Sequence, residues 1–177
     1  RRSIVTVFNS FILAGILIGL VTFSVVIGFY NYEASMKDLK SKTSNFADLA
    51  SVSLKEPVWN YDEAALQSVF TAILLDADMV AIRVLSPTEE TTTAEKKKQE
   101  FQKVEFNQLL KDQHYLNKIA TISRENKPIA RVQIISSPER VRATIRNTTI
   151  LITVFALAFM AVISSFIWGM GKRVLSK

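Results

Sequence analysis

Two long apolar runs without acidic or basic residues limit the folds open to this chain of 177 residues. No Lys, Arg, Asp, Glu or His occurs from Ser3 to Tyr32, or from Asn147 to Gly171. Each run exceeds the roughly 20 apolar residues with which an α-helix crosses a bilayer. We expect two transmembrane helices, rather than a signal peptide and a buried core helix, with a polar domain between them.

The basic residues lie where they orient a membrane protein. Residues 31–147 hold 17 basic and 16 acidic groups, whereas the flanks of the two runs are purely basic. Basic residues favour the cytoplasmic side, so we expect both termini in the cytoplasm and residues 31–147 outside it. The near-neutral middle argues against nucleic-acid binding. The flanking residues are Arg1, Arg2, Lys172, Arg173 and Lys177.

Two patterns predict a homodimer. Gly15 and Gly19 form a GxxxG pair, which lets membrane helices approach closely, although glycine is also common in such helices. Past the membrane, a heptad-like stripe includes Met36 and Leu39. The alternative is that this helix packs on the domain's own core through Phe46, Leu49 and Val52. The stripe consists of Met36, Leu39, Thr43, Phe46, Ala50 and Ser53.

The segment from residue 57 to 62 predicts a hinge. A proline disfavours the α conformation of the residue before it, so we expect the first helix to end by Glu56. Asn60 or Asp62 can then cap the next helix through a side-chain oxygen. The last helix should open at Ser137-Pro138-Glu139, with a capping hydroxyl and a proline. The candidate hinge residues are Pro57, Asn60, Asp62 and Pro138.

Between these helices the pattern predicts an α+β domain with about three antiparallel strands. Apolar residues from Leu66 to Leu74 are spaced as on an amphipathic helix, and 79–85 is apolar and β-branched. Residues 115–123 and 129–136 form a predicted hairpin whose turn includes Asn126. We expect residues 88–113 to be an excursion, partly helical, whose three lysines at 96–98 are solvated or meet anionic lipid or an acidic partner.

The predicted boundaries follow from these elements. They are a transmembrane helix at 1–31, an external sensor domain at 32–137, a juxtamembrane helix at 138–147, a second transmembrane helix at 148–171 and the start of a cytoplasmic linker at 172–177.

No catalytic or metal-binding pattern emerges. There is no cysteine, His114 is the only histidine, and a zinc site built from one histidine is unpersuasive. Asp76 and Asp78 suit a helix end better than a calcium site. We therefore expect no enzyme activity and no cofactor within these residues.

A ligand pocket is conceivable near the Trp59 segment. Its candidate residues are Trp59, Tyr61, Arg83, His114 and Tyr115. We favour Trp59 as a core anchor over a ligand platform. Arg83 interrupts an apolar strand, and it either faces solvent by alternation or binds Asp62 or an anionic ligand.

The order of elements in this chain resembles a known class of input domain. A long helix is followed by Pro57-Val58-Trp59-Asn60-Tyr61-Asp62, then by an amphipathic helix and then by the strand Val80-Ala81-Ile82-Arg83-Val84-Leu85. It is similar to the PAS-like or CHASE-type periplasmic sensor domains of bacterial receptor histidine kinases and diguanylate cyclases, with a LapD-like layout. The ending Lys172-Arg173-Val174-Leu175-Ser176-Lys177 looks like the entrance to a HAMP linker.

The resemblance implies the input module of a receptor histidine kinase of a two-component system, or of a diguanylate cyclase, in the bacterial inner membrane. Its partners would be the lipid bilayer, a second copy of the chain, and a small periplasmic ligand or a periplasmic protein. The alternative is a non-signalling anchor or scaffold whose periplasmic domain docks a partner protein. A HAMP-like and catalytic continuation would favour the receptor.

Overall fold

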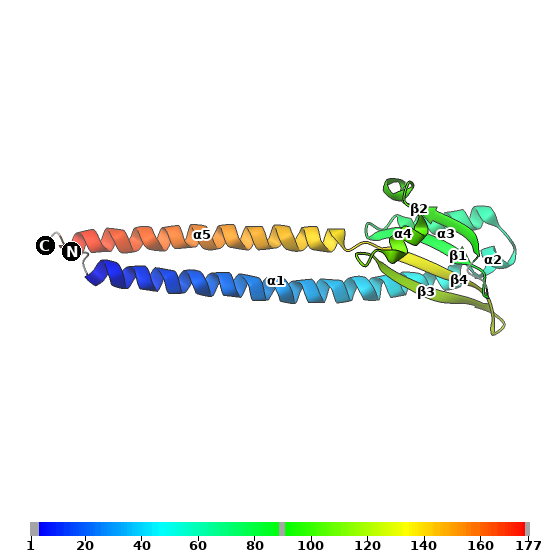
Figure 1. Cartoon of the computed structure of the whole chain (residues 1–177), viewed down its shortest axis with the longest axis horizontal. Helices are drawn as coiled ribbons and strands as arrows, with labels where there is room; N and C mark the ends of the chain where they lie inside the picture. Colours follow the sequence, from blue (N-terminus) through cyan, green and yellow to red (C-terminus); the bar gives the residue numbers. More distant parts are fainter. Residues whose placement is uncertain (1–3, 89–90, 176–177) are drawn as a thin grey trace. The chain divides into compact units, whose positions relative to one another are not determined.

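The computed structural model describes residues 4–88 and 91–175, and for 4–10, 12–13 and 166–175 it describes the backbone alone. The chain divides into two compact units. Unit 1 comprises Arg1–Glu33 and Arg142–Lys177, and unit 2 comprises Ala34–Val141. Figure 1 labels the helices and strands of both.

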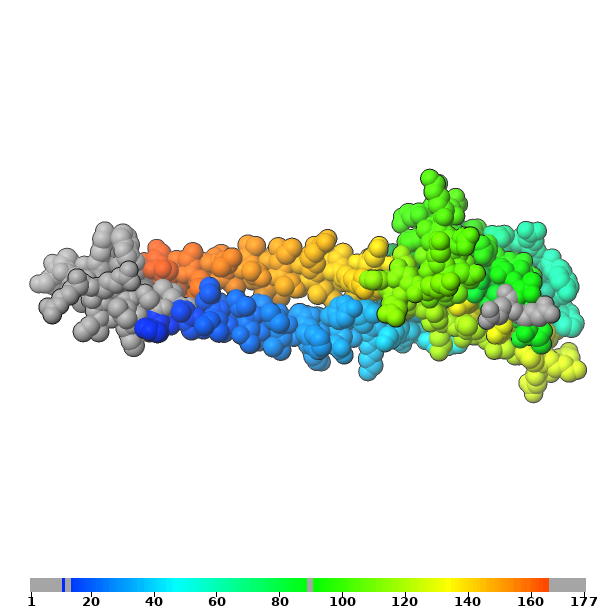
Figure 2. All heavy atoms as spheres, viewed as in Figure 1, coloured from blue at the N-terminus to red at the C-terminus, as the bar shows by residue number. Residues whose placement is uncertain are grey.

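Unit 1 is built from helix α1 (Ile4–Ser53) and helix α5 (Glu139–Leu175). Both are long and apolar enough to cross a membrane, and the most apolar stretch of each helix is not buried inside the protein. The two helices lie side by side in the coloured part of unit 1 in Figure 2. A Cβ on Gly28 would lie 3.6 Å from Thr149 Oγ1, so the helices approach closely there. A Cβ on Gly15 or Gly19 would meet nothing within 4 Å.

The polar half of α1 belongs to unit 2 and packs through small side chains. Leu39, Thr43, Ala47 and Ala50 are buried at a spacing of three or four residues, which keeps them on one helix face. Part of the heptad-like stripe therefore packs on the domain's own core. Phe46 is half-buried against that core, as the alternative predicted, whereas Leu49 and Val52 are exposed, so the alternative is wrong for these two residues.

Helix α2 (Lys55–Trp59) corrects the predicted role of Pro57 as a helix stop. α1 ends at Ser53, and Pro57 lies inside α2. Because proline has no N–H, it cannot bond to the carbonyl four residues earlier, which is that of Ser53. The break therefore falls one turn before the proline, while helical hydrogen bonds continue from Val58 N to Leu54 O at 2.9 Å.

Helix α3 (Glu63–Leu74) and strand β1 (Met79–Leu85) match the predicted elements. Asp62 is the N-cap of α3, and its Oδ1 accepts from the backbone N–H of Ala65 at 3.0 Å. Asn60 instead ends α2. The apolar face of α3 packs against α1 and one face of the sheet in the main core.

The sheet has four antiparallel strands rather than three, in the order β2-β1-β4-β3. The additional strand is β2 (Thr92–Lys97), which pairs with β1 at the edge of the sheet. The rest of the excursion forms the 3-10 turn η1 (Gln99–Phe101) and helix α4 (Phe106–Lys111). Phe106 and Leu109 of α4 cover the other face of the sheet, forming a second core.

Strands β3 (Leu116–Arg124) and β4 (Lys127–Ser136) form the predicted hairpin with a tighter turn than expected. Its two turn residues, Glu125 and Asn126, have φ of 50° and 63°, as a type I′ turn requires. At the end of β4, Ser137 Oγ accepts from the backbone N–H of Glu139 at 3.2 Å, which confirms the predicted start of α5.

Candidate functional site

The five predicted pocket residues do not converge on one site. Trp59 and Tyr61 line a groove beside the main core. Arg83 alternates with Ile82 and Val84 along β1, so it lies on the opposite face of the sheet, where it contacts Phe106 of the second core. The candidate set therefore separates into a groove and an unrelated polar group.

The groove has a volume of about 640 Å³, within the range of small-molecule sites. Its walls come from the α2–α3 connection and from the adjoining ends of β1, β2 and β4. Most of the surface is apolar, including Val58, Leu66 and Ile129. Glu63 is the one acidic or basic residue among the described residues that line it.

Trp59 is not the core anchor that the sequence suggested. Its side chain is 52% exposed, and the guanidinium of Arg124 lies 4.6 Å from the centre of its ring. The same guanidinium approaches Glu56 Oε2 at 3.4 Å. Trp59 is the last residue of α2. Val58 before it packs against the main core, whereas Trp59 lines the groove and contacts Arg124.

Tyr61 holds a backbone conformation that favours glycine. Its φ is 54°. Asp62 N donates to Pro57 O at 2.9 Å and Tyr61 N to Val58 O at 3.4 Å, which is the Schellman pattern that ends a helix with a left-handed residue. A side chain there costs about 1–2 kcal/mol, yet this one is 87% exposed and lines the groove.

Arg83 is held by side chains on its own face of the sheet. Its Nε donates to Gln133 Oε1 at 2.8 Å, and one terminal nitrogen donates to Asn107 Oδ1 at 3.3 Å. The guanidinium also lies 4.3 Å from the centre of the Phe106 ring. These contacts fasten α4 to the sheet, so Arg83 does not reach Asp62 or the groove.

The remaining two candidates lie around the loop before β3. His114 is exposed, with Nδ1 2.6 Å from Asp112 Oδ1. Tyr115 packs edge-on against Phe101, with ring centres 6.2 Å apart. Burial, followed by the negative charges of Glu139 and Asp112, raises the pKa of Tyr115. Both residues act within the fold and neither lines the groove.

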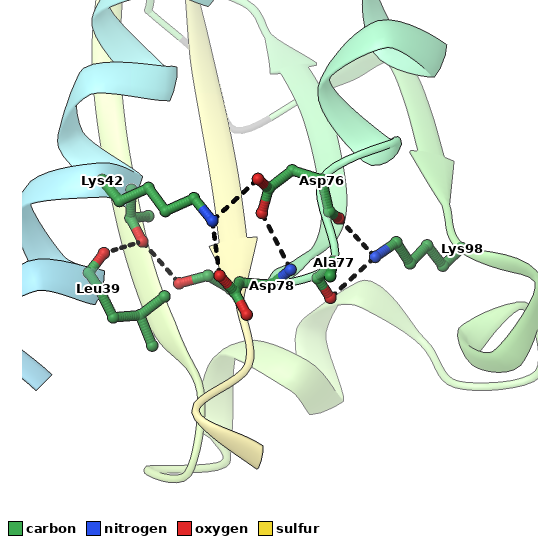
Figure 3. Close-up of polar contacts among 8 residues, drawn as sticks. Leu39, Lys42, Asp76, Ala77, Asp78 and Lys98 are labelled. Carbon is green, nitrogen blue, oxygen red and sulfur yellow. Dashed lines mark hydrogen bonds and ion pairs between the residues drawn. The ribbon is translucent and has the colours of Figure 1, made fainter. Parts of the chain in front are cut away.

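A second polar group, the junction cluster, comprises Lys42, Thr43, Asp76, Asp78, Lys98, Ser136 and Ser137. Figure 3 shows Lys42 of α1 reaching both carboxylates of the loop between α3 and β1. Lys42 Nζ lies 2.8 Å from Asp76 Oδ2 and 2.6 Å from Asp78 Oδ2. Lys98 Nζ donates to the backbone carbonyls of Asp76 and Ala77 at 2.6 and 3.0 Å.

Lys42 and Asp76 each favour the ionised form of the other. Burial works to lower the pKa of Lys42, but its hydrogen bonds to Asp76 and Asp78 and their charges outweigh this and raise it. Burial likewise works to raise the pKa of Asp76, but hydrogen bonds from Lys42 and from the backbone N–H of Asp78, together with the charges of Lys42 and Lys98, lower it.

The junction cluster also holds the end of β4, from which α5 begins. Thr43 Oγ1 and Ser136 Oγ are 2.7 Å apart, and Ser137 N donates to Asp78 O at 2.8 Å. Both helices that continue into unit 1 are therefore bonded, within unit 2, to the residues around Asp78. The sequence placed Asp76 and Asp78 at a helix end but gave no sign of Lys42, whose distance of 36 residues from Asp78 hides the contact.

The lysines at 96–98 are partly exposed and are also bonded within the fold. Lys96 Nζ donates to Thr71 Oγ1 at 2.7 Å and Lys97 Nζ to Val104 O at 2.9 Å. Together with Lys98, they fasten β2 to its neighbours on both sides of the sheet.

In the described part of the chain, no three His, Cys, Asp or Glu side chains gather as a metal site would need. Asp76 and Asp78 are instead paired with Lys42. No protein-family model matches the chain, and no curated protein matches its sequence.

Proposed function

We propose that this chain is the signal input module of a bacterial transmembrane receptor. In this proposal both termini lie in the cytoplasm, unit 2 lies in the periplasm, and two copies associate through α1. A cue received by unit 2 shifts α5 relative to α1 and so changes the activity of a cytoplasmic output domain. The basic flanks of the apolar runs support this orientation.

The observation that carries the proposal is the junction cluster. Lys42 of α1 and Ser137, two residues before α5, are both bonded to Asp78. A change in the position of this loop alters the bonding of both helices at once. Such an input works by a shift between two arrangements, driven by whatever binds one of them better.

The second candidate is a non-signalling anchor whose periplasmic domain docks a partner protein. The exposed Leu49 and Val52 of α1 support it, because apolar side chains on an aqueous helix face suit an interface. An anchor needs no coupling between the loop at Asp78 and α5, so the two candidates differ in a measurable way.

The test is a disulfide cross-linking scan in membranes. The chain has no cysteine, so single cysteines can be placed along residues 141–165 without a background. We expect the pattern of cross-linking between two copies to differ between the wild type and Lys42→Met, which breaks the junction cluster. The same pattern in both, with cross-links present, would contradict signalling and favour the anchor. Lys40→Met, an exposed neighbour, is the control and should leave the pattern unchanged.

A further inference from the structure

The groove beside Trp59 carries a chemical bias in its lining. Glu63 is the one acidic or basic residue among the described residues of its wall, and the other polar side-chain groups are hydroxyls and the indole N–H of Trp59. No basic side chain lies among them. Arg124 and Arg131 approach the wall from outside, at Trp59 and Ser86. The one charge within the lining itself is the carboxylate of Glu63, which favours a cation.

The aromatic residues at the mouth of the groove reinforce this bias. Trp59 and Tyr61 are both exposed and both line it. The faces of such rings attract cations, tryptophan most strongly. Trp59 already holds one cation within the fold, because Arg124 lies over its ring at 4.6 Å. Half of the tryptophan side chain remains open to a ligand.

The backbone at Tyr61 indicates that its side chain is kept for a purpose other than stability. Position 61 ends α2 in a left-handed conformation that glycine adopts without cost. A tyrosine there strains the backbone and gains little burial, since its side chain is mostly exposed. Strain of this kind concentrates at binding sites, where the side chain and not the fold requires it.

We propose that this groove binds a small organic cation with an apolar body, namely an alkyl or aromatic amine or quaternary ammonium ion. The cationic head lies between the rings of Trp59 and Tyr61 and near the carboxylate of Glu63. The apolar body occupies the floor beside Leu66 and Ile129. The inference gives the ligand class of the proposed receptor's input site, and it rests on the proposed function in treating the groove as that site.

The test uses the full chain in detergent micelles and three matched probes: benzyltrimethylammonium, benzyl alcohol and phenylacetate. Trp168→Phe leaves Trp59 as the sole tryptophan, whose fluorescence reports binding. We expect the cation to bind at least about fivefold more tightly than either of the other probes, as a cation–ring contact together with a carboxylate gives. Absence of saturable binding up to about 10 mM of the cation would overturn the proposal.

Three variants locate the site. Glu63→Gln should bring the affinities for the cation and the alcohol to within about twofold, and Tyr61→Gly should weaken the cation at least about threefold while the protein stays folded. Asp48→Asn, an exposed acid on α1, is the matched control and should change neither. In Trp59→Leu with native Trp168, the remaining fluorescence comes from Trp168 alone. Any change in it on adding a probe shows how much of the probe merely partitions into the micelle. A cation preference that survives Glu63→Gln would contradict the proposed site.

The outcome is separable from that of the proposed function. Failure of all probes to bind, with cross-linking that still responds to Lys42→Met, would overturn the ligand class alone. Selective cation binding with unresponsive cross-linking would support the ligand class and contradict the signalling role.

Discussion

At the scale of single residues, Tyr61 and Lys42 occupy positions where function and stability make different demands. Tyr61 ends a helix where glycine is the usual choice, and Lys42 balances two carboxylates that would otherwise repel. Neither side chain belongs to the two cores, so a substitution at either position reports on its own contacts and not on core packing.

Tyr61→Gly should not destabilise the protein and should stabilise it by up to about 1 kcal/mol. It relieves about 1–2 kcal/mol of left-handed strain, partly offset by the greater freedom of glycine in the unfolded chain. Urea unfolding of the full chain, followed by circular dichroism, measures this. A loss of more than about 1 kcal/mol would show that the exposed ring contributes to the fold after all.

Lys42→Met should lower the stability of the full chain by about 1–2 kcal/mol at neutral pH, because two partly buried carboxylates lose their partner while Lys42 itself is partly solvated. Lys40→Met should stay within about 0.5 kcal/mol. Denaturant unfolding followed by Trp59 fluorescence in the Trp168→Phe background measures both. Equal effects of the two substitutions would contradict the role of the junction cluster.

The same difference between wild type and Lys42→Met should depend on pH in a defined way. The folded pKa of Asp76 lies below its ordinary value of 3.8, so the stabilisation is complete above that pH and is lost as pH falls below it. The folded pKa of Lys42 lies above 10.5, so the stabilisation is complete below that pH and is lost above it. The free energies of unfolding of the wild type and Lys42→Met should therefore differ most, and by a constant amount, at pH values between these two ordinary pKa values.

Local chemistry made some residues predictable. The cap at Asp62 and the opening of α5 at Ser137 depend on neighbours within three residues, and both were expected from the sequence. The exposure of Trp59 was not, because it depends on the direction in which α2 leaves the core. The partner of Lys42 lies beyond the reach of any local pattern.

At the scale of elements, α1 shows how one helix serves several surfaces. Its polar half buries a face of small residues against the sheet, and Leu39 is only 3% exposed. Leu39 is therefore not available as the dimer contact that the heptad-like stripe suggested. The exposed Leu49 and Val52, and Gly15 and Gly19 in the apolar half, remain open for a second copy.

Gly19→Ile should reduce dimerisation in membranes, because the branched side chain prevents close approach of two α1 helices. Since a Cβ at position 19 meets nothing in its own chain, the fold of a single copy should be unaffected. Cross-linking through a single cysteine in α1 measures the dimer, and circular dichroism serves as the check on folding. Undiminished cross-linking would remove GxxxG from the interface.

Strand β2 was missed for a physical reason. Its sequence, Thr-Thr-Ala-Glu-Lys-Lys, lacks both apolar alternation and a buried face, since it is an edge strand that pairs on one side only. Charged residues are common on such edges because they discourage pairing with other chains. The central strands β1 and β4 are buried and apolar, and their sequences predicted them.

At the scale of the whole molecule, the chain combines an apolar groove, the junction cluster and two long apolar helices. The fold class and the two long helices followed from patterns of charge and hydropathy along the chain. The site did not, because the groove and the junction cluster are assembled from residues far apart in sequence. In the proposed function, the junction cluster controls the position of α5 relative to α1 in the membrane.

The most direct test is the distance between spin labels at Phe23→Cys and Phe155→Cys, two exposed positions of unit 1. It is measured by pulsed electron paramagnetic resonance in lipid nanodiscs, with labelled chains diluted in unlabelled ones. We predict that Lys42→Met shifts the distance distribution by about 1–2 Å or more, the size of helix shifts in such transitions. Lys40→Met should leave it as in the wild type. Identical distributions in all three proteins would contradict the account.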